Sequence, residues 1–281
     1  MNQVVMKKVL SPIIKLIEID SPLIARKAKP GQFIMIRVND NGERIPLTIS
    51  DFNREKGTIT LIFQEIGKST KLLGQLEVGD FVLDLVGPLG NPTEINFKNV
   101  AVIGGGLGTA LIFTQVKQMH ANGAKVDVII GARTKELVML ENEIKPYCES
   151  LTIVTDDGTY GQKGFVTNVL KDLIDKGHKY DCVMAVGPLV MMKAVSNLTK
   201  EYGIHTIVSM NPIMIDGTGM CGGCRLTVGG VTKFACVDGP EFDGHLVDFD
   251  EAIRRTAIYK QEEKQSLEAH ECKIGRFTTN A

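Results

Sequence analysis

The sequence contains no tryptophan, and aromatic residues make up only 6% of its 281 positions. It also has no long uninterrupted apolar run, because the longest one, residues 100–116, includes four glycines and is too short to span a bilayer comfortably. The net charge of −1 gives no reason to expect nucleic acid or an anionic membrane surface as a partner. The N-terminus does not follow the pattern of a signal peptide. We therefore expect a cytoplasmic protein that contacts neither nucleic acid nor membrane.

The chain also lacks the Cys-x2-Cys-x2-Cys-x3-Cys run that is typical of [4Fe-4S] clusters. Three of its six cysteines, Cys148, Cys182 and Cys272, are scattered, which suits a reducing compartment better than a disulfide framework. The length indicates about two domains, and 43% hydrophobic residues are typical of a globular protein with a buried core.

The other three cysteines gather in one segment near the C-terminus, Asp216-Gly-Thr-Gly-Met-Cys221-Gly-Gly-Cys224, followed by Cys236. Plant-type [2Fe-2S] proteins show the spacing Cys-x4-Cys-x2-Cys with a distant fourth cysteine. Here Asp216 stands where the first cysteine would be. The glycines allow tight turns that point backbone N–H groups at the sulfurs. The segment predicts a [2Fe-2S] cluster held by Asp216, Cys221, Cys224 and Cys236.

Two alternatives for this segment remain open at the level of residues. A zinc site accepts three cysteines and a histidine or aspartate, and His245 is a candidate for the fourth ligand. The other alternative is a redox-active Cys-x-x-Cys pair with an unrelated third cysteine.

The first part of the chain, residues 1–97, has the pattern of a small β-barrel. Short runs rich in Ile, Val and Phe alternate with Pro-Gly, Asn-Gly and Lys-Gly turns. The predicted strands are residues 4–10, 13–19, 32–38, 58–64 and 81–86. A predicted helix at residues 69–76 follows a turn of small residues whose N–H groups can face an anion.

Three motifs in this part resemble those of ferredoxin-reductase-type flavoproteins, in the same order along the chain. They are Pro30-Gly-Gln-Phe33, Arg44-Ile-Pro-Leu-Thr48 and Gly67-Lys-Ser-Thr70. The arginine can clamp a phosphate bidentately. The resemblance implies that FAD binds here, with contacts from Arg44, Pro46, Leu47, Thr48, Gly67, Lys68, Ser69 and Thr70.

Residues 98–210 alternate predicted strands and helices, which indicates a doubly wound parallel sheet that binds a dinucleotide. A buried strand at 100–103 leads into a glycine-rich loop and a helix at 110–121. Thr109 takes the place of the last glycine of Gly-x-Gly-x-x-Gly. The predicted loop contacts are Gly104, Gly105, Gly106, Gly108 and Thr109. Further candidates at the ends of later strands are Gly131, Arg133, Asp156, Asp157, Gly187 and Pro188.

Two arguments disagree on whether the nucleotide is NAD(H) or NADP(H). Arg133, with no acid beside it at the end of the second strand, favours the 2′-phosphate of NADP(H). The family resemblance favours NAD(H) and leaves NADP(H) as the alternative.

The order of flavin, nucleotide and [2Fe-2S] parts resembles the electron-transfer subunits of dihydroorotate dehydrogenases. The segment from Asn211 to Arg225, with Phe234-Ala-Cys236, is similar to that of the small subunits of NADH-dependent reduced ferredoxin:NADP+ oxidoreductases, in which an aspartate replaces the first cysteine. The resemblance implies electron transfer between NAD(H), FAD and the cluster, and flavin-based bifurcation. It also implies a larger partner subunit that carries FAD and [4Fe-4S] clusters, and an indirect link to ferredoxin and NADP(H).

We therefore expect a β-barrel plus α/β fold: a ferredoxin-reductase-like FAD barrel at residues 1–97, a doubly wound NAD-binding domain at 98–210, and a [2Fe-2S] segment at 211–246. Residues 247–281 are predicted to contain one charged helix, at 248–268, that contacts the partner or covers its own domain. Rival functions are the electron-transfer subunit of a dihydroorotate dehydrogenase, a stand-alone ferredoxin-NADP+ reductase, and a sensor.

Overall fold

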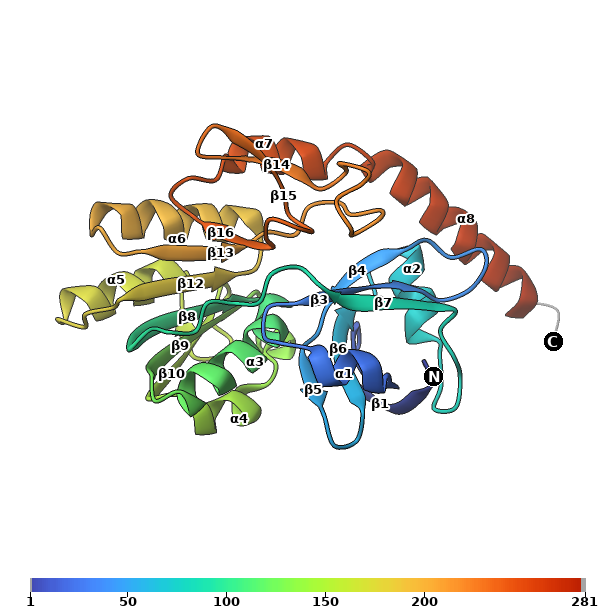
Figure 1. The fold of residues 1–281 in the computed structure, drawn as a ribbon, viewed down its shortest axis with the longest axis horizontal. Helices are drawn as coiled ribbons and strands as arrows, with labels where there is room; N and C mark the ends of the chain where they lie inside the picture. The colour runs from blue at the N-terminus through green and yellow to red at the C-terminus, as the bar shows by residue number, and fades with distance from the viewer. Residues whose placement is uncertain (1, 279–281) are drawn as a thin grey trace.

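The computed structural model describes the main chain of residues 2–278 and the side chains as far as Ala269. Three parts follow one another, namely a barrel, a parallel sheet flanked by helices, and a C-terminal part that lies against both (Figure 1). No helix in the described part of the chain is long and apolar enough to cross a membrane.

The N-terminal part is the predicted antiparallel barrel, built from a four-stranded sheet of order β1-β2-β6-β5 and a three-stranded sheet of order β4-β3-β7. Alternate residues of the strands fill its core, as Ile59, Leu61 and Phe63 do from β6. The strands are β1 (Val4–Ser11), β2 (Ile14–Asp20), β3 (Phe33–Arg37), β4 (Ile45–Thr48), β5 (Asp51–Asn53), β6 (Thr58–Gln64) and β7 (Asp84–Leu89). Two short helices, α1 (Pro22–Lys27) and α2 (Lys68–Gly74), interrupt them.

The middle part is the predicted doubly wound sheet, of order β11-β10-β9-β8-β12-β13-β16. All neighbours pair in parallel except β16, which runs antiparallel to β13. The chain starts at β8 and builds outward first on one side and then on the other, so that the topological switch point lies between β8 and β12. The strands are β8 (Asn99–Gly105), β9 (Lys125–Ala132), β10 (Ser150–Thr155), β11 (Gln162–Lys163), β12 (Cys182–Val186), β13 (Thr206–Ser209) and β16 (Glu241–Asp243).

Helices cover both faces of this sheet, because its strands are apolar on both sides. One face packs against α3 (Gly108–Ala121) and α4 (Glu141–Ile144), and the other against α5 (Val166–Asp175) and α6 (Leu189–Glu201). The hydrophobic cluster on the second face continues into barrel residues Phe33 and Met35 and into Cys224 and Cys236. One hydrophobic cluster therefore includes residues of all three parts.

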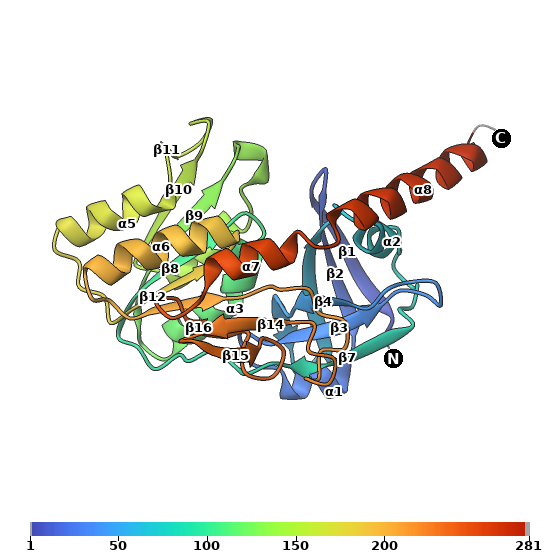
Figure 2. The ribbon, with the colours of Figure 1, turned by 90° about the horizontal axis from the view of Figure 1, so that it is seen from above.

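The C-terminal part begins with the hairpin of β14 (Arg225–Val228) and β15 (Val231–Phe234), after which β16 joins the edge of the large sheet. The prediction of a single helix at residues 248–268 is wrong, because the structure has α7 (Phe249–Thr256) and α8 (Lys260–Thr278). The Thr256 hydroxyl donates back to the Ile253 carbonyl, a local bond that competes with helix continuation. After this break, α7 stays against α6 while α8 crosses over α2 of the barrel (Figure 2).

Candidate cofactor sites

The glycine-rich loop after β8 lies at the switch point, where three backbone segments approach one another closely. A Cβ atom on Gly108, the first residue of α3, would lie 2.0 Å from the Val186 carbonyl oxygen. A Cβ on Gly105 would lie 2.4 Å from Met191 Sδ, and one on Gly187 would lie 2.9 Å from the Gly105 oxygen. Only glycine permits this approach, which leaves the start of α3 open to a pyrophosphate.

The structure explains why Thr109 is tolerated in place of the last glycine of the motif. That glycine normally lets the helix pack closely on the strand. Here the space comes from the strand, because a Cβ on Gly104 would lie 2.8 Å from Thr109 Cα. The Thr109 hydroxyl is buried and has no hydrogen-bond partner among the described residues. A buried hydroxyl at the loop and a cradle that any Cβ would fill both fit a dinucleotide.

The other predicted nucleotide contacts lie at the same edge of the sheet but differ in their surroundings. Pro188 directly precedes α6, and the Gly131 carbonyl accepts from the Gly106 N–H at 2.8 Å. Arg133 is exposed at the end of β9. The carboxylate of Asp157 accepts from the Thr159 N–H at 2.9 Å and from its hydroxyl at 2.8 Å, and these bonds hold the Asp157 pKa low. The Asp157 carboxylate therefore stabilises the turn in which it lies.

In the barrel, Arg44 directly precedes β4, which pairs with β3 so that Pro46 and Leu47 oppose Met35 and Ile34. The Arg44 guanidinium donates to Asp84 Oδ2 at 2.7 Å, and this bond lowers the pKa of Asp84. A guanidinium has five N–H donors, so this partner leaves others for a phosphate. The bond to Asp84 therefore orients Arg44 and leaves N–H groups that could bind a phosphate.

The predicted turn at Gly67 begins α2, and the side chain of Thr70 caps it. Thr70 Oγ1 accepts from the Gly67 N–H at 3.0 Å and from the Ile66 N–H at 3.2 Å. Ser69 is buried, and its hydroxyl lies 3.5 Å from Glu43 Oε2. The N–H groups of the first helical turn, from Lys68 onward, are the donors that α2 has left for an anion.

The β14–β15 hairpin brings together two of the predicted cluster ligands. Cys224 directly precedes β14 and Cys236 lies just beyond β15, whose register pairs Arg225 with Phe234. The two sulfurs therefore lie 3.2 Å apart, and both cysteines are buried. Burial and the neighbouring Cys224 thiol raise the pKa of Cys236 to about 12. A metal that binds this pair has to displace the protons.

Cys221 and Asp216 form the other half of the predicted site, on an exposed loop. Hydrogen bonds from the Gly223 and Asp216 backbone amides to the sulfur lower the pKa of Cys221. Asp216 Oδ2 accepts from the Thr218 hydroxyl and from the N–H groups of Thr218 and Met220, and these bonds lower the Asp216 pKa. Positive φ angles at Gly217, Gly219 and Gly222 allow these turns.

The four groups are arranged as two pairs. Among the described residues, no three His, Cys, Asp or Glu side chains surround a single point as a tetrahedral zinc site requires. A two-iron cluster is held differently, because its ligands divide between two metal atoms. The donor set of three sulfurs and one carboxylate, with N–H groups turned toward Cys221, fits this arrangement.

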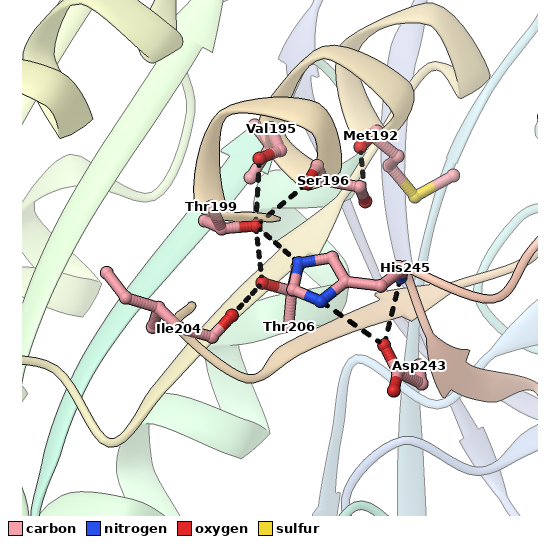
Figure 3. A network of polar contacts seen from close by, with 8 residues as sticks. All are labelled: Met192, Val195, Ser196, Thr199, Ile204, Thr206, Asp243 and His245. Atoms are coloured by element: carbon pink, nitrogen blue, oxygen red, sulfur yellow. Dashed lines mark hydrogen bonds and ion pairs between the residues drawn. The ribbon is translucent and has the colours of Figure 1, made fainter. Parts of the chain in front are cut away.

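His245, the candidate for a fourth zinc ligand, points toward α6 (Figure 3). Its Nε2 lies 3.0 Å from Thr199 Oγ1, and its backbone N–H donates to Asp243 Oδ1 at 2.9 Å. Thr206 extends the same network, with its hydroxyl 2.6 Å from that of Thr199. The network fastens the turn after β16 to α6.

The loop that contains Asp216 and Cys221 packs directly on the barrel. A Cβ on Gly217 would lie 2.6 Å from the Met35 side chain and 3.2 Å from that of Leu89. Met35 also pairs with Pro46 on β4, two residues after Arg44, so the loop of Asp216 and the motif of Arg44 meet at Met35. This adjacency is not visible in the sequence, where the two residues are far apart.

Several residues that shape these sites were not identified from the sequence. Asp84 holds Arg44, and Arg255 supports the cluster loop through a hydrogen bond to the Gly223 carbonyl at 3.3 Å. Glu241 lies within the predicted [2Fe-2S] segment at residues 211–246, but it does not belong to the ligand spacing. A lone acid or arginine in a strand or helix has no local signal for such a contact.

Comparisons with known proteins show which families this chain resembles. A sequence profile for the iron–sulfur cluster binding domain of dihydroorotate dehydrogenase B matches residues 211–248. A Thermotoga maritima protein described as a dihydroorotate dehydrogenase B (NAD+) electron transfer subunit homolog is 45% identical, over 95% of both chains. A probable electron transfer subunit from Methanocaldococcus jannaschii is 34% identical, over 90% of this chain and 91% of the relative.

A solved structure is also closely similar. A chain of the NADH-dependent reduced ferredoxin-NADP oxidoreductase, reported for flavin-based electron bifurcation, superposes with a TM-score of 0.91 at 43% identity, covering 96% of this chain and 98% of that one. The ferredoxin reductase of carbazole 1,9a-dioxygenase shares the fold at 19% identity, with a TM-score of 0.60 over 73% of this chain and 67% of that one. The profile assigns the cysteine segment to iron–sulfur binding, so the zinc alternative is wrong.

Proposed function

Because this chain belongs to the family of dihydroorotate dehydrogenase B electron-transfer subunits, we propose that its Arg44, glycine loop and cysteine segment hold FAD, NAD(H) and a [2Fe-2S] cluster in one relay. The chain is an electron-transfer subunit of an NAD-dependent flavin and iron–sulfur oxidoreductase, and it works with a larger partner subunit. When bound, the three cofactors supply hydride exchange, conversion between two-electron and one-electron transfer, and single-electron transfer.

The observation that carries the proposal is the adjacency of the three sites. The cluster loop packs on Met35, which pairs with Pro46 of the Arg44 motif, and the glycine loop approaches Met191, which packs against the same hydrophobic cluster. Arg44 and the first turn of α2 would hold the FAD phosphates. The start of α3 would hold the nucleotide pyrophosphate, and Asp216, Cys221, Cys224 and Cys236 would ligate the cluster.

The finer proposal is that the larger subunit carries FAD and [4Fe-4S] clusters, and that the pair catalyses bifurcating NADH-dependent ferredoxin:NADP+ oxidoreduction. Asp216 at the first ligand position supports this assignment over a dihydroorotate dehydrogenase subunit. The likeness to the reduced ferredoxin-NADP oxidoreductase chain supports it as well. α8, which crosses α2, remains a candidate contact for that partner.

The direct test is anaerobic purification followed by cofactor analysis. We expect two iron atoms per flavin, as one [2Fe-2S] cluster and one FAD require. NADH should bleach the flavin faster than NADPH does. A colourless protein without iron and flavin would contradict the proposal.

A second experiment separates the bifurcating assignment from its rival. The chain is affinity-purified from its own cells, and the copurifying subunit is analysed for cofactors. A larger subunit with FAD and [4Fe-4S] clusters supports the bifurcating enzyme. A partner that contains FMN and oxidises dihydroorotate supports the dihydroorotate dehydrogenase subunit instead.

A further inference from the structure

Three parts of the chain meet at the carboxyl group of Glu241. Glu241 lies on β16, within the iron–sulfur segment, and its Oε1 accepts from the Thr93 hydroxyl at 2.7 Å and from Gln115 Nε2 at 2.7 Å. Thr93 belongs to the connection between barrel and sheet, and Gln115 to α3. The barrel closes the site, because a Cβ on Gly31 would lie 2.1 Å from Thr93 Oγ1 and 2.9 Å from Glu241 Oε1.

No cation compensates this carboxylate in the described structure. Glu241 takes part in no ion pair among the described residues, and β13 places the uncharged Ser209 opposite it. Burial, together with smaller contributions from the charges of Glu94 and Glu241, raises the pKa of Cys182 on β12. On α3 the nearby cation Lys117 is paired with Asp51 at 2.7 Å. The carboxylate therefore depends on its two hydrogen bonds.

We propose that Glu241 is a positioning residue that fixes the cluster segment against α3 and the barrel connection through Gln115 and Thr93. Gln115 is only 1% exposed and Thr93 only 6%, so water does not readily replace a broken bond. Separating β16 from α3 would leave buried polar groups unpaired, at a cost that resists the movement. The chain from Cys236 to Glu241 is short and is itself tied down, with the Gly239 carbonyl accepting from the Asn91 N–H at 2.6 Å.

The barrel also contacts α3 through residues other than Glu241, so loss of Glu241 should affect mainly the cluster segment. Lys117 on α3 pairs with Asp51 on β5, and Ile14 and Ile62 of the barrel pack into the hydrophobic cluster of α3. Loss of the Glu241 carboxylate should therefore loosen the cluster segment more than it loosens the barrel against the nucleotide helix. This expectation rests on the proposed electron transfer from flavin to cluster.

The experiment compares wild type and Glu241→Gln as anaerobic full-length holoproteins in stopped flow. Flavin reduction by NADH and the subsequent reduction of the cluster are recorded separately between pH 5.5 and 8.5. We expect Glu241→Gln to slow cluster reduction by about tenfold, as small misplacements do, while flavin reduction changes by less than about threefold. Burial raises the pKa of Glu241 to about 7, so the variant should also lose an inflection near that pH.

Two further variants make the test specific. Asp243→Asn removes the same charge on the same strand, where the carboxylate accepts from the His245 N–H instead, and it should leave both rates unchanged. Thr93→Val removes one donor without a change in charge. It should slow cluster reduction less than Glu241→Gln does, and it should move the inflection to higher pH. If Glu241→Gln does not fold, the same two rates and the pH profile are measured on Thr93→Val alone.

The proposal is overturned if Glu241→Gln reduces its cluster at the wild-type rate with the wild-type pH profile. It is also overturned if both reduction steps slow equally, since that result indicates a general loss of structure. If wild type itself shows no flavin bleaching by NADH, the failure lies with the proposed function.

Discussion

At the scale of single residues, the predicted cluster ligands differ more in their surroundings than their spacing suggests. Cys224 and Cys236 are 2% and 3% exposed, whereas Cys221 is exposed on a loop with Asp216. The pKa values of the exposed Cys221 and the half-buried Asp216 are lowered, whereas the pKa of the buried Cys236 is raised. The two halves of the site therefore present different electrostatic environments to a bound metal.

The first prediction concerns Asp216. Asp216→Cys should retain a two-iron cluster, because the spacing then matches the plant-type pattern in full. It should shift the cluster potential by an amount on the order of tens of millivolts, since a thiolate replaces a harder oxygen ligand. Redox titration followed by EPR measures the shift. Thr218→Ala, which removes a hydroxyl bonded to Asp216 but no ligand, should change the potential less. An unchanged potential in Asp216→Cys would argue against ligation by Asp216.

At the scale of elements, the sequence located the strand, loop and helix of the nucleotide site within two residues. The predicted strand at 100–103 lies in β8, and the helix predicted at 110–121 is α3, which begins at Gly108. The spacing of apolar residues and the positions of glycines are local signals, so they can be interpreted without the tertiary structure. The prediction of one continuous C-terminal helix is wrong. The break between α7 and α8 depends on tertiary contacts, since α7 packs against α6 and α8 packs against α2.

The second prediction concerns the start of α3. Gly108→Ala should weaken NADH binding by about tenfold and lower stability by about 1–3 kcal/mol, because its Cβ meets the Val186 carbonyl oxygen and α3 has to move. Isothermal titration and urea unfolding measure the two effects. Gln118→Ala, on the same helix, removes a side chain that bonds only Asn122 among the described residues, and it should change neither quantity. Wild-type affinity in Gly108→Ala would exclude the loop as the binding site.

At the scale of the whole molecule, the three parts are joined by one hydrophobic cluster and by the hydrogen bonds of Glu241. The hydrophobic cluster that includes Phe33 and Met35 of the barrel also includes Val208 of the sheet and Cys236 of the cluster segment. Such continuity allows one unit to hold several cofactors at fixed separations.

The third prediction follows from the Glu241 pKa, which rises from 4.5 in the unfolded chain to about 7 in the folded protein. Between these values the folded state binds more protons than the unfolded state, so stability falls as pH rises from about 4.5 to about 7 and then levels off. The loss is on the order of 2–3 kcal/mol. Urea unfolding at pH 5 and pH 7.5 should show it in wild type, with a smaller pH dependence in Glu241→Gln. Equal pH dependence in both proteins would contradict it.

The sequence by itself determined the β-barrel, the doubly wound sheet and the cysteine segment, because each depends on local periodicity, turn residues or spacing. It also determined the residue types that can bind phosphate and iron. Only the tertiary structure decided that Gly217 packs on Met35 of the barrel, that Cys224 faces Cys236, and that His245 faces α6. These contacts join residues whose partners are distant in the chain, and packing selects them from many side chains of the same type.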